Sequence, residues 1–165
     1  MIHAEKPLLI TSSLLDSYAW YEDSPASWKE KAERDLVNAL NRVYTGLDEA
    51  AARGVDFENK ICRDLYMSPE AFEAKHGAML MDFYKECAGG TQQAVLKKTL
   101  PIDDQAFVFY GRADILFNDR IIDVKTTNRW TGHGKYLSRA QHLLYISASG
   151  IEKFTTRARA GVIAR

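Results

Sequence analysis

Residues 111–127, GRADILFNDRIIDVKTT, decide the fold class of this chain. Aromatic and β-branched residues are frequent on both sides of Asn118-Asp119, which predicts two strands, over 107–117 and 120–127. Asn118-Asp119 itself is typical of a tight hairpin turn. The stretch therefore predicts two neighbouring strands that run antiparallel.

Charged residues interrupt the second of these strands. Side chains alternate across a strand, so Asp123 and Lys125 share one face while Ile122 and Val124 share the other. The hairpin can set Asp114 of the first strand beside them. An acid in such an apolar strand is costly unless it is paired or binds an ion. Two carboxylates and a lysine suit a hard divalent cation such as Mg²⁺, and the alternative is a buried Asp–Lys ion pair that stabilises the hairpin.

Helices are expected on both sides of the hairpin, in the overall order αβββαβ. Apolar residues at helical spacing, with capping residues at Thr11 and Ser68, make residues 1–90 mainly helical. The expected helices cover 14–22, 28–44, 51–66, 69–72, 78–87 and 136–149, and the other strands begin near Ala94 and cover 153–160. We therefore predict an α/β fold in a single domain over 1–165, with a small mixed β-sheet in 91–165 flanked by helices.

The charges are divided unevenly along the chain. Lys and Arg number 22 and Asp and Glu number 22, so the formal net charge is zero. Residues 1–96 carry 10 basic and 16 acidic side chains, whereas residues 97–165 carry 12 basic and 6 acidic ones. A basic second half suggests a polyanion partner, although chance and solvated helix faces explain the division equally well. A net charge of zero therefore does not exclude a nucleic acid that binds one face.

Cysteine usage and hydropathy exclude several classes of protein. Cys62 and Cys87 are too few for a disulfide framework or for a four-cysteine zinc or iron–sulfur site. No stretch approaches the roughly 20 apolar residues of a transmembrane helix, and the first residues show no cleavage-site pattern. We expect a cytoplasmic protein with no membrane partner.

Three motifs follow one another in the second half of the chain: GRAD at 111–114, IDVKT at 122–126 and QHLLY at 141–145. The segments TSSLLDSY at 11–18 and GVDFE at 54–58 precede them. Together they resemble the PD-(D/E)XK nuclease superfamily, and within it the RecB-like and phage exonuclease branch. Ala113 stands where the name motif has proline, and Glu58 stands where many RecB-like nucleases have histidine. The resemblance covers nearly the whole chain and implies a restriction-endonuclease-like core.

The resemblance also implies a metal site. Asp114 and Asp123 would be the principal Mg²⁺ ligands together with the backbone carbonyl of Val124, and Mn²⁺ would substitute for Mg²⁺. Glu58 would be a third carboxylate that meets the metal directly or through water. Lys125 would orient the attacking water or stabilise charge on the phosphate.

Further residues are expected around this metal. Gln141 and Tyr145 are four residues apart on one helix face and would position the water or the DNA backbone. For Tyr145, packing at the border of the core is an equal alternative. Four basic residues near the proposed site would contact phosphate groups, each with a solvated surface charge as its alternative: Arg112, Arg129, Lys135 and Arg139.

The sequence as a whole predicts a Mg²⁺-dependent DNA nuclease that hydrolyses phosphodiester bonds. The resemblance implies a role in DNA recombination, repair or phage genome processing in a bacterial or phage-infected cell, with exonuclease activity favoured. DNA is the expected partner, and a recombination or repair protein or further copies of the chain are additional ones. The alternatives are a catalytically inactive DNA- or protein-binding module of the same fold, and an interaction protein that works through its acidic helical half.

Overall fold

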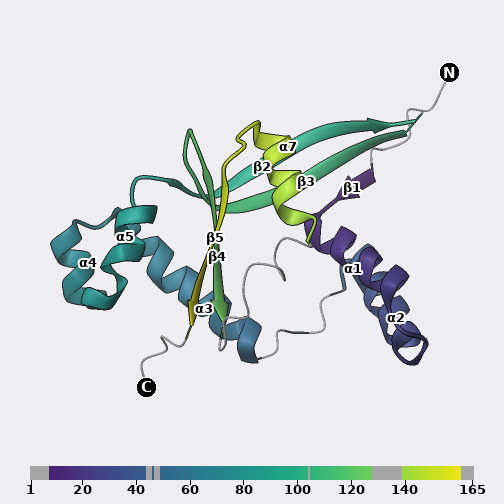
Figure 1. Cartoon of the computed structure of the whole chain (residues 1–165), viewed down its shortest axis with the longest axis horizontal. Coiled ribbons are helices and arrows are strands. Elements are labelled where there is room, and N and C mark those ends of the chain that lie inside the picture. The colour runs from purple at the N-terminus through teal and green to yellow at the C-terminus, as the bar shows by residue number, and fades with distance from the viewer. Residues whose placement is uncertain (1–7, 44–45, 47–48, 104, 128–138, 161–165) are drawn as a thin grey trace. The chain divides into compact units, whose positions relative to one another are not determined.

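The computed structural model is α/β, with a mixed sheet flanked by helices (Figure 1). It describes residues 8–43, 46, 49–103, 105–127 and 139–160. The chain forms two compact units, and two long strands contribute to both. The first unit comprises Met1–Gly46, Val95–Arg112 and His133–Gly150, and the second comprises Leu47–Ala94, Ala113–Gly132 and Ile151–Arg165.

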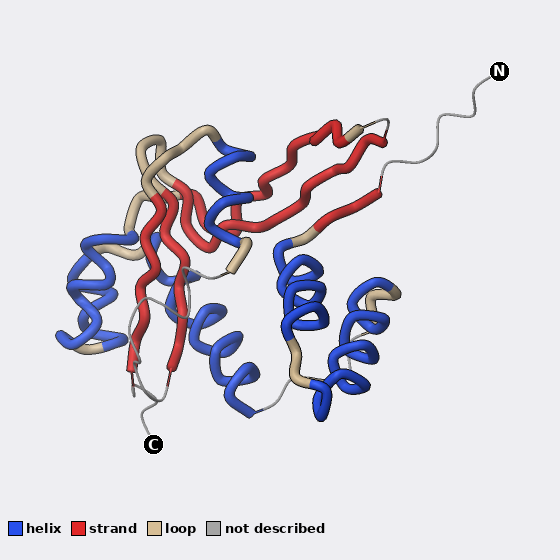
Figure 2. The backbone as a smooth tube through the Cα atoms, turned by 45° about the vertical axis from the view of Figure 1, so that its right-hand side comes forward, coloured by secondary structure: helices blue, strands red, loops and turns tan. Residues whose placement is uncertain are grey.

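The first unit combines helices with most of the two long strands. Its elements are β1 (Leu8–Ile10), α1 (Ser12–Asp23), a 3-10 turn (Ala26–Trp28), α2 (Lys29–Leu40), the larger parts of β2 (Thr91–Ile102) and β3 (Gln105–Leu116), and α7 (Gln141–Ser149). The Thr11 hydroxyl accepts the N–H of Leu14 at 3.2 Å, so the predicted N-cap of α1 is confirmed. Helices α1 and α2 pack against each other as a hairpin (Figure 2).

The second unit packs short helices on one face of its strands. Its elements are α3 (Glu49–Ile61), a 3-10 segment (Cys62–Tyr66), α4 (Pro69–His76), a 3-10 turn (Ala78–Leu80), α5 (Met81–Cys87), β4 (Ile121–Thr127), β5 (Phe154–Ala160) and the adjoining ends of β2 and β3. Ser68 caps α4 by accepting the N–H of Ala71 at 3.3 Å, and Pro69 opens that helix, as its sequence predicts.

The strands form a mixed sheet in the order β1-β3-β4-β5, with β2 also paired to β3. Strands β3 and β4 run antiparallel, with Ile115 opposite Ile122 and Leu116 opposite Ile121, so the predicted hairpin is confirmed. Strand β5 is parallel to β4 along the whole length of both. Strand β1 is parallel to β3 and was not predicted, because three residues are too short for an alternating pattern and depend on pairing with β3.

The alternation predicted for the IDVKT motif is confirmed by burial. Ile122 and Val124 belong to a core formed with the helices of the second unit, and Asp123 lies on the opposite face of the strand. Helix α3 lies close against β4, since a Cβ atom at Gly54 would come within 2.9 Å of the Thr126 hydroxyl. The other members of this core are Phe57, Ile61, Cys62, Leu65, Phe72, Leu80, Phe83, Tyr84, Cys87 and Ile115.

Several element boundaries differ from the prediction. The helix expected over 51–66 begins at Glu49 and tightens into 3-10 geometry at Cys62. The helix expected over 28–44 ends at Leu40, and Arg42 follows with a left-handed φ of 55°. Strand β2 begins at Thr91 rather than near Ala94. The predicted loop at 128–134 and residues 136–138 of the helix expected at 136–149 lie outside the described residues, and that helix, α7, begins at Gln141.

No helix within the described ranges has the length and apolar character that a membrane crossing requires.

Candidate functional site

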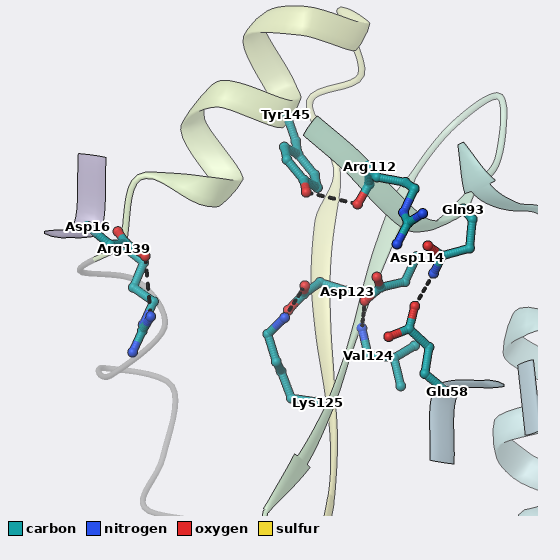
Figure 3. A network of polar contacts seen from close by, with 10 residues as sticks. All are labelled: Asp16, Glu58, Gln93, Arg112, Asp114, Asp123, Val124, Lys125, Arg139 and Tyr145. Atoms are coloured by element: carbon teal, nitrogen blue, oxygen red, sulfur yellow. Dashed lines mark hydrogen bonds and ion pairs between the residues drawn. The ribbon is translucent and has the colours of Figure 1, made fainter. Parts of the chain in front are cut away.

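All three predicted site carboxylates, which Figure 3 shows as sticks, belong to the second unit. Asp123 lies in β4 and is 3% exposed. Asp114 lies near the end of β3 and is partly buried, as is Glu58 on α3. Each acid comes from a different element, so the packing of α3 on the sheet and the β3–β4 pairing together bring this group of carboxylates into one region.

The Asp114 side chain accepts a hydrogen bond from the backbone of the neighbouring strand β4. The antiparallel pairs of β3 and β4 are Ile115 with Ile122 and Leu116 with Ile121. One residue further along β3, the Asp114 carboxylate accepts the backbone N–H of Val124 at 2.7 Å (Figure 3). The side chain therefore acts in place of a strand partner and holds β4 against β3. The resemblance implies a metal contact for the Val124 carbonyl, and the hydrogen bond described here involves the N–H of the same residue.

Asp123 and Lys125 form the ion pair that the sequence offered as an alternative to a metal site. The Lys125 ammonium lies 2.6 Å from Asp123 Oδ1, and the two side chains are 33% and 4% exposed. The pairing offsets the cost of burying the Asp123 carboxylate. It also confirms that both side chains leave β4 on the same face.

The pKa of Asp114 is raised from 3.8 to about 7. Burial is the largest cause, and the nearby Asp123 carboxylate adds to it. Glu58 raises this pKa further, while Lys125 and the Val124 N–H lower it. Asp114 therefore resists ionisation near neutral pH because its charge is removed from water and lies near two other carboxylates, and a bound cation would favour its ionised form.

Gln93 of β2 donates a hydrogen bond from its side-chain amide to Glu58 Oε1 (Figure 3). Gln93 is not among the residues predicted from the sequence, and no local signal marks it, since a lone amide in a strand is ordinary. One turn after Glu58, the Cys62 thiol has its pKa raised to about 12, mainly by burial and further by Glu58, Asp114 and Cys87. This thiol stays protonated and is part of the core.

The three carboxylates do not converge on a single point. Across the described residues, no group of three His, Cys, Asp or Glu side chains is arranged to hold a metal ion. Asp123 contacts Lys125, Asp114 contacts the Val124 N–H, and Glu58 contacts Gln93. The donors are nevertheless all oxygen atoms, the type that Mg²⁺ prefers, and Mg²⁺ needs only one or two carboxylates because it keeps several waters. The donor set therefore fits Mg²⁺ by chemistry.

Tyr145 has a packing role in the first unit. It is 5% exposed, and its hydroxyl donates to the Arg112 carbonyl at 2.9 Å. Its ring lies 6.1 Å from the Phe109 ring, centroid to centroid. Gln141, the first residue of α7, is partly buried and belongs to the same unit, whereas the carboxylates belong to the second.

The predicted phosphate contacts have different environments. Arg112 is exposed on β3. Arg139 is 49% exposed and forms an ion pair with Asp16 at 3.2 Å, and Asp16 also accepts the N–H of Ala140. Surface pairs of this kind are weak, so Asp16 reduces the charge that Arg139 presents without fixing the side chain. Arg129 and Lys135 lie outside the described residues.

Gly111 of the GRAD motif is expected to tolerate no larger side chain. A Cβ atom there would lie 2.6 Å from Tyr145 Cε1 and 2.9 Å from Phe109 Cζ. Because both rings are buried, Gly111→Ala is expected to destabilise the protein by about 1–3 kcal/mol through overpacking. Urea denaturation measures the effect. In a Tyr145→Leu background the same substitution should cost less, and an equal cost in both backgrounds would contradict this assignment.

No protein-family model matches the chain, and no curated protein sequence does. Among solved structures, the chain is similar to the protein described as "Crystal structure of SSO0001", with a TM-score of 0.52 and 15% sequence identity. The similarity covers 95% of this chain and 65% of that protein. At this identity the likeness concerns the fold alone, and the chain spans less than two thirds of that protein's length.

Proposed function

We propose that this chain is a Mg²⁺-dependent DNA nuclease of the PD-(D/E)XK type, built on a restriction-endonuclease-like core. The observation that carries the proposal is the grouping of Asp114 with Asp123 and Glu58: burial is the largest cause of the Asp114 pKa of about 7, and both neighbouring carboxylates raise it further. Three interacting carboxylates beside a lysine are costly to a fold that gains nothing from them. The similarity to a solved structure at 15% identity concerns the fold and does not indicate an activity.

The residues have separate roles in the proposed site. Asp114, Asp123 and the Val124 carbonyl would hold Mg²⁺, with Glu58 as a direct or water-mediated ligand. The ion, when bound, supplies a polarised phosphodiester oxygen and a water of lowered pKa. Lys125, whose ammonium pairs with Asp123, would orient that water or stabilise charge on the phosphate.

The remaining predicted residues bind substrate in this proposal. Gln141 would orient the water or the DNA backbone. Arg112 and Arg139 would contact phosphate groups. Arg139 would then give up its ion pair with Asp16 and bind a phosphate of the DNA. Tyr145 would support Arg112 through the hydrogen bond to its carbonyl. Exonuclease action remains the favoured mode, in recombination, repair or phage genome processing.

A specific observation favours a second candidate, a catalytically inactive module that binds DNA or protein. Each of the three carboxylates contacts a donor of the protein itself, and the described residues include no ready-made metal cluster. In such a module the Asp123–Lys125 pair would be purely structural. DNA binding that is equally strong in EDTA and in Mg²⁺ is expected of this candidate.

DNA cleavage in the presence and absence of metal tests the proposal. Purified protein is incubated with end-labelled linear DNA and with closed circular DNA, in Mg²⁺, in Mn²⁺ or in EDTA. A nuclease is expected to degrade linear DNA in either metal and to be inactive in EDTA, and an exonuclease leaves the circle intact. Absence of cleavage in both metals, with DNA binding retained in EDTA, would favour the inactive module.

A further inference from the structure

Gln93 has an unusual backbone conformation for its place in a strand. Its φ is 51°, in the left-handed region that glycine favours, although it lies inside β2. Among the described residues, the other non-glycine positions with positive φ are Arg42 and Asp103, and both lie in turns. A long side chain held in this conformation within a strand indicates local strain that the surrounding structure maintains.

The start of β2 is fixed tightly, which explains how the strain is maintained. A Cβ atom at Gly90 would lie 2.4 Å from Ile115 and 2.8 Å from the Phe117 ring, so only glycine lets the backbone pass so close to these side chains. Three residues later the left-handed turn at Gln93 interrupts the alternation of the strand, and Gln92, Gln93 and Ala94 are all partly buried. The irregularity aims the Gln93 side chain at α3.

The target of this side chain is one carboxylate of the proposed site. The Gln93 amide donates to Glu58 Oε1 (Figure 3). A hydrogen bond to a charged acceptor is stronger than one between neutral groups, so it restrains the Glu58 rotamer effectively. The neutral Gln93 amide orients the Glu58 carboxylate without adding a positive charge. The Lys125 ammonium that pairs with Asp123, in contrast, carries a charge that would compete with a bound cation.

We propose that Gln93 is a positioning residue that holds the Glu58 carboxylate in the orientation in which it serves the divalent metal. This inference rests on the proposed metal site, which it deepens. Partners of this kind, one shell away from a metal, commonly change metal affinity 10–100-fold when they are removed. The strained conformation of Gln93 is then maintained because it aims the amide, and not because it stabilises the strand.

The substitution Gln93→Gly distinguishes a role in orienting Glu58 from a role in stabilising the strand. Glycine removes the amide and also accepts φ near 51° without strain, so the melting temperature is expected to be unchanged or higher. The affinity for Mn²⁺, measured from the free-ion signal in electron paramagnetic resonance, is expected to fall about 10-fold. In a Glu58→Gln background, Gln93→Gly is expected to cause no further loss, because the carboxylate it positions is already gone.

Asp103→Gly is the matched control. It relaxes a left-handed residue with φ of 50° at the turn after β2, in the first unit, whereas the proposed metal ligands belong to the second. Its Mn²⁺ affinity should equal that of the wild type. The proposal is overturned if Gln93→Gly binds Mn²⁺ as tightly as the wild type, or if it lowers the melting temperature by several degrees. If the wild type shows no Mn²⁺ binding that depends on Asp123, the proposed function fails first, and this inference fails with it.

Discussion

Asp123→Asn is expected to reduce the rate of DNA cleavage by at least about 10³-fold while the protein remains folded. The Asp123 side chain is 4% exposed and its carboxylate contacts the Lys125 ammonium at 2.6 Å. An asparagine oxygen can still accept a hydrogen bond from Lys125, so the strand keeps its contact. The substitution removes the negative charge, however, and with it the strongest proposed attraction for Mg²⁺.

Asp119→Asn is the control for this substitution. Asp119 is 63% exposed beside Arg120 between β3 and β4, and its replacement should leave cleavage unchanged. Initial rates on end-labelled linear DNA, with far-ultraviolet circular dichroism as a check on folding, provide the measurement. Cleavage by folded Asp123→Asn at the wild-type rate would exclude Asp123 from the metal site and the proposed mechanism with it.

Asp114→Asn is expected to stabilise the metal-free protein at pH 8, on the order of 3 kcal/mol, and to abolish cleavage. The pKa of Asp114 is about 7 in the folded protein against 3.8 for the free group, mainly because of burial. Burying its charge at pH 8 is therefore unfavourable. Asparagine carries no charge, and its side-chain oxygen can still accept the Val124 N–H that Asp114 accepts at 2.7 Å.

The sign of the pH dependence follows from the raised pKa. Between about pH 4 and pH 7 the folded protein binds more protons at Asp114 than the unfolded chain does, so the stability contributed by this group falls as the pH rises. Below pH 4 both states are protonated, and above pH 7 both are ionised. The advantage of Asp114→Asn should therefore be small near pH 4 and reach its full value above pH 7.

Asp64→Asn is a control in which the opposite result is expected. Asp64 is also buried, but a hydrogen bond from Lys75 lowers its pKa, and contact with His76 at 2.7 Å acts in the same direction. Removing its charge should destabilise the protein at pH 8. Urea denaturation in EDTA from pH 5 to pH 8 measures both variants, and a loss of stability in Asp114→Asn at pH 8 would show that its charge is compensated in the native state.

Much of the fold could be predicted because its signals are local. The alternation of residues 121–127 places Asp123 opposite the core, and Thr11 and Ser68 cap the helices that follow them. Strand β1 could not be predicted, because three residues become a strand only through pairing with the distant β3. The 3-10 segment Cys62–Tyr66 was also missed, since its apolar residues continue the helical pattern of α3.

Around the candidate site, the shared face of two side chains could be predicted from the sequence, and most of the contacts could not. Spacing indicated that Asp123 and Lys125 share a face, and their ion pair confirms this. The hydrogen bond of Asp114 to Val124 depends on where the β3–β4 pairing ends, and the contact of Gln93 with Glu58 depends on an unusual backbone conformation. Both are tertiary effects that no single motif encodes.

The hydrogen bond between Asp114 and Val124 also affects which substitutions at position 114 the fold can accept during evolution. A single nucleotide change converts an aspartate codon into an asparagine codon, and the product keeps the sheet contact while losing a buried charge. In the proposed nuclease, this substitution would therefore give a more stable chain without cleavage activity. If Asp114 serves the proposed nuclease, selection for cleavage would be what retains aspartate, and inactive descendants that persist as binding modules are expected to arise readily.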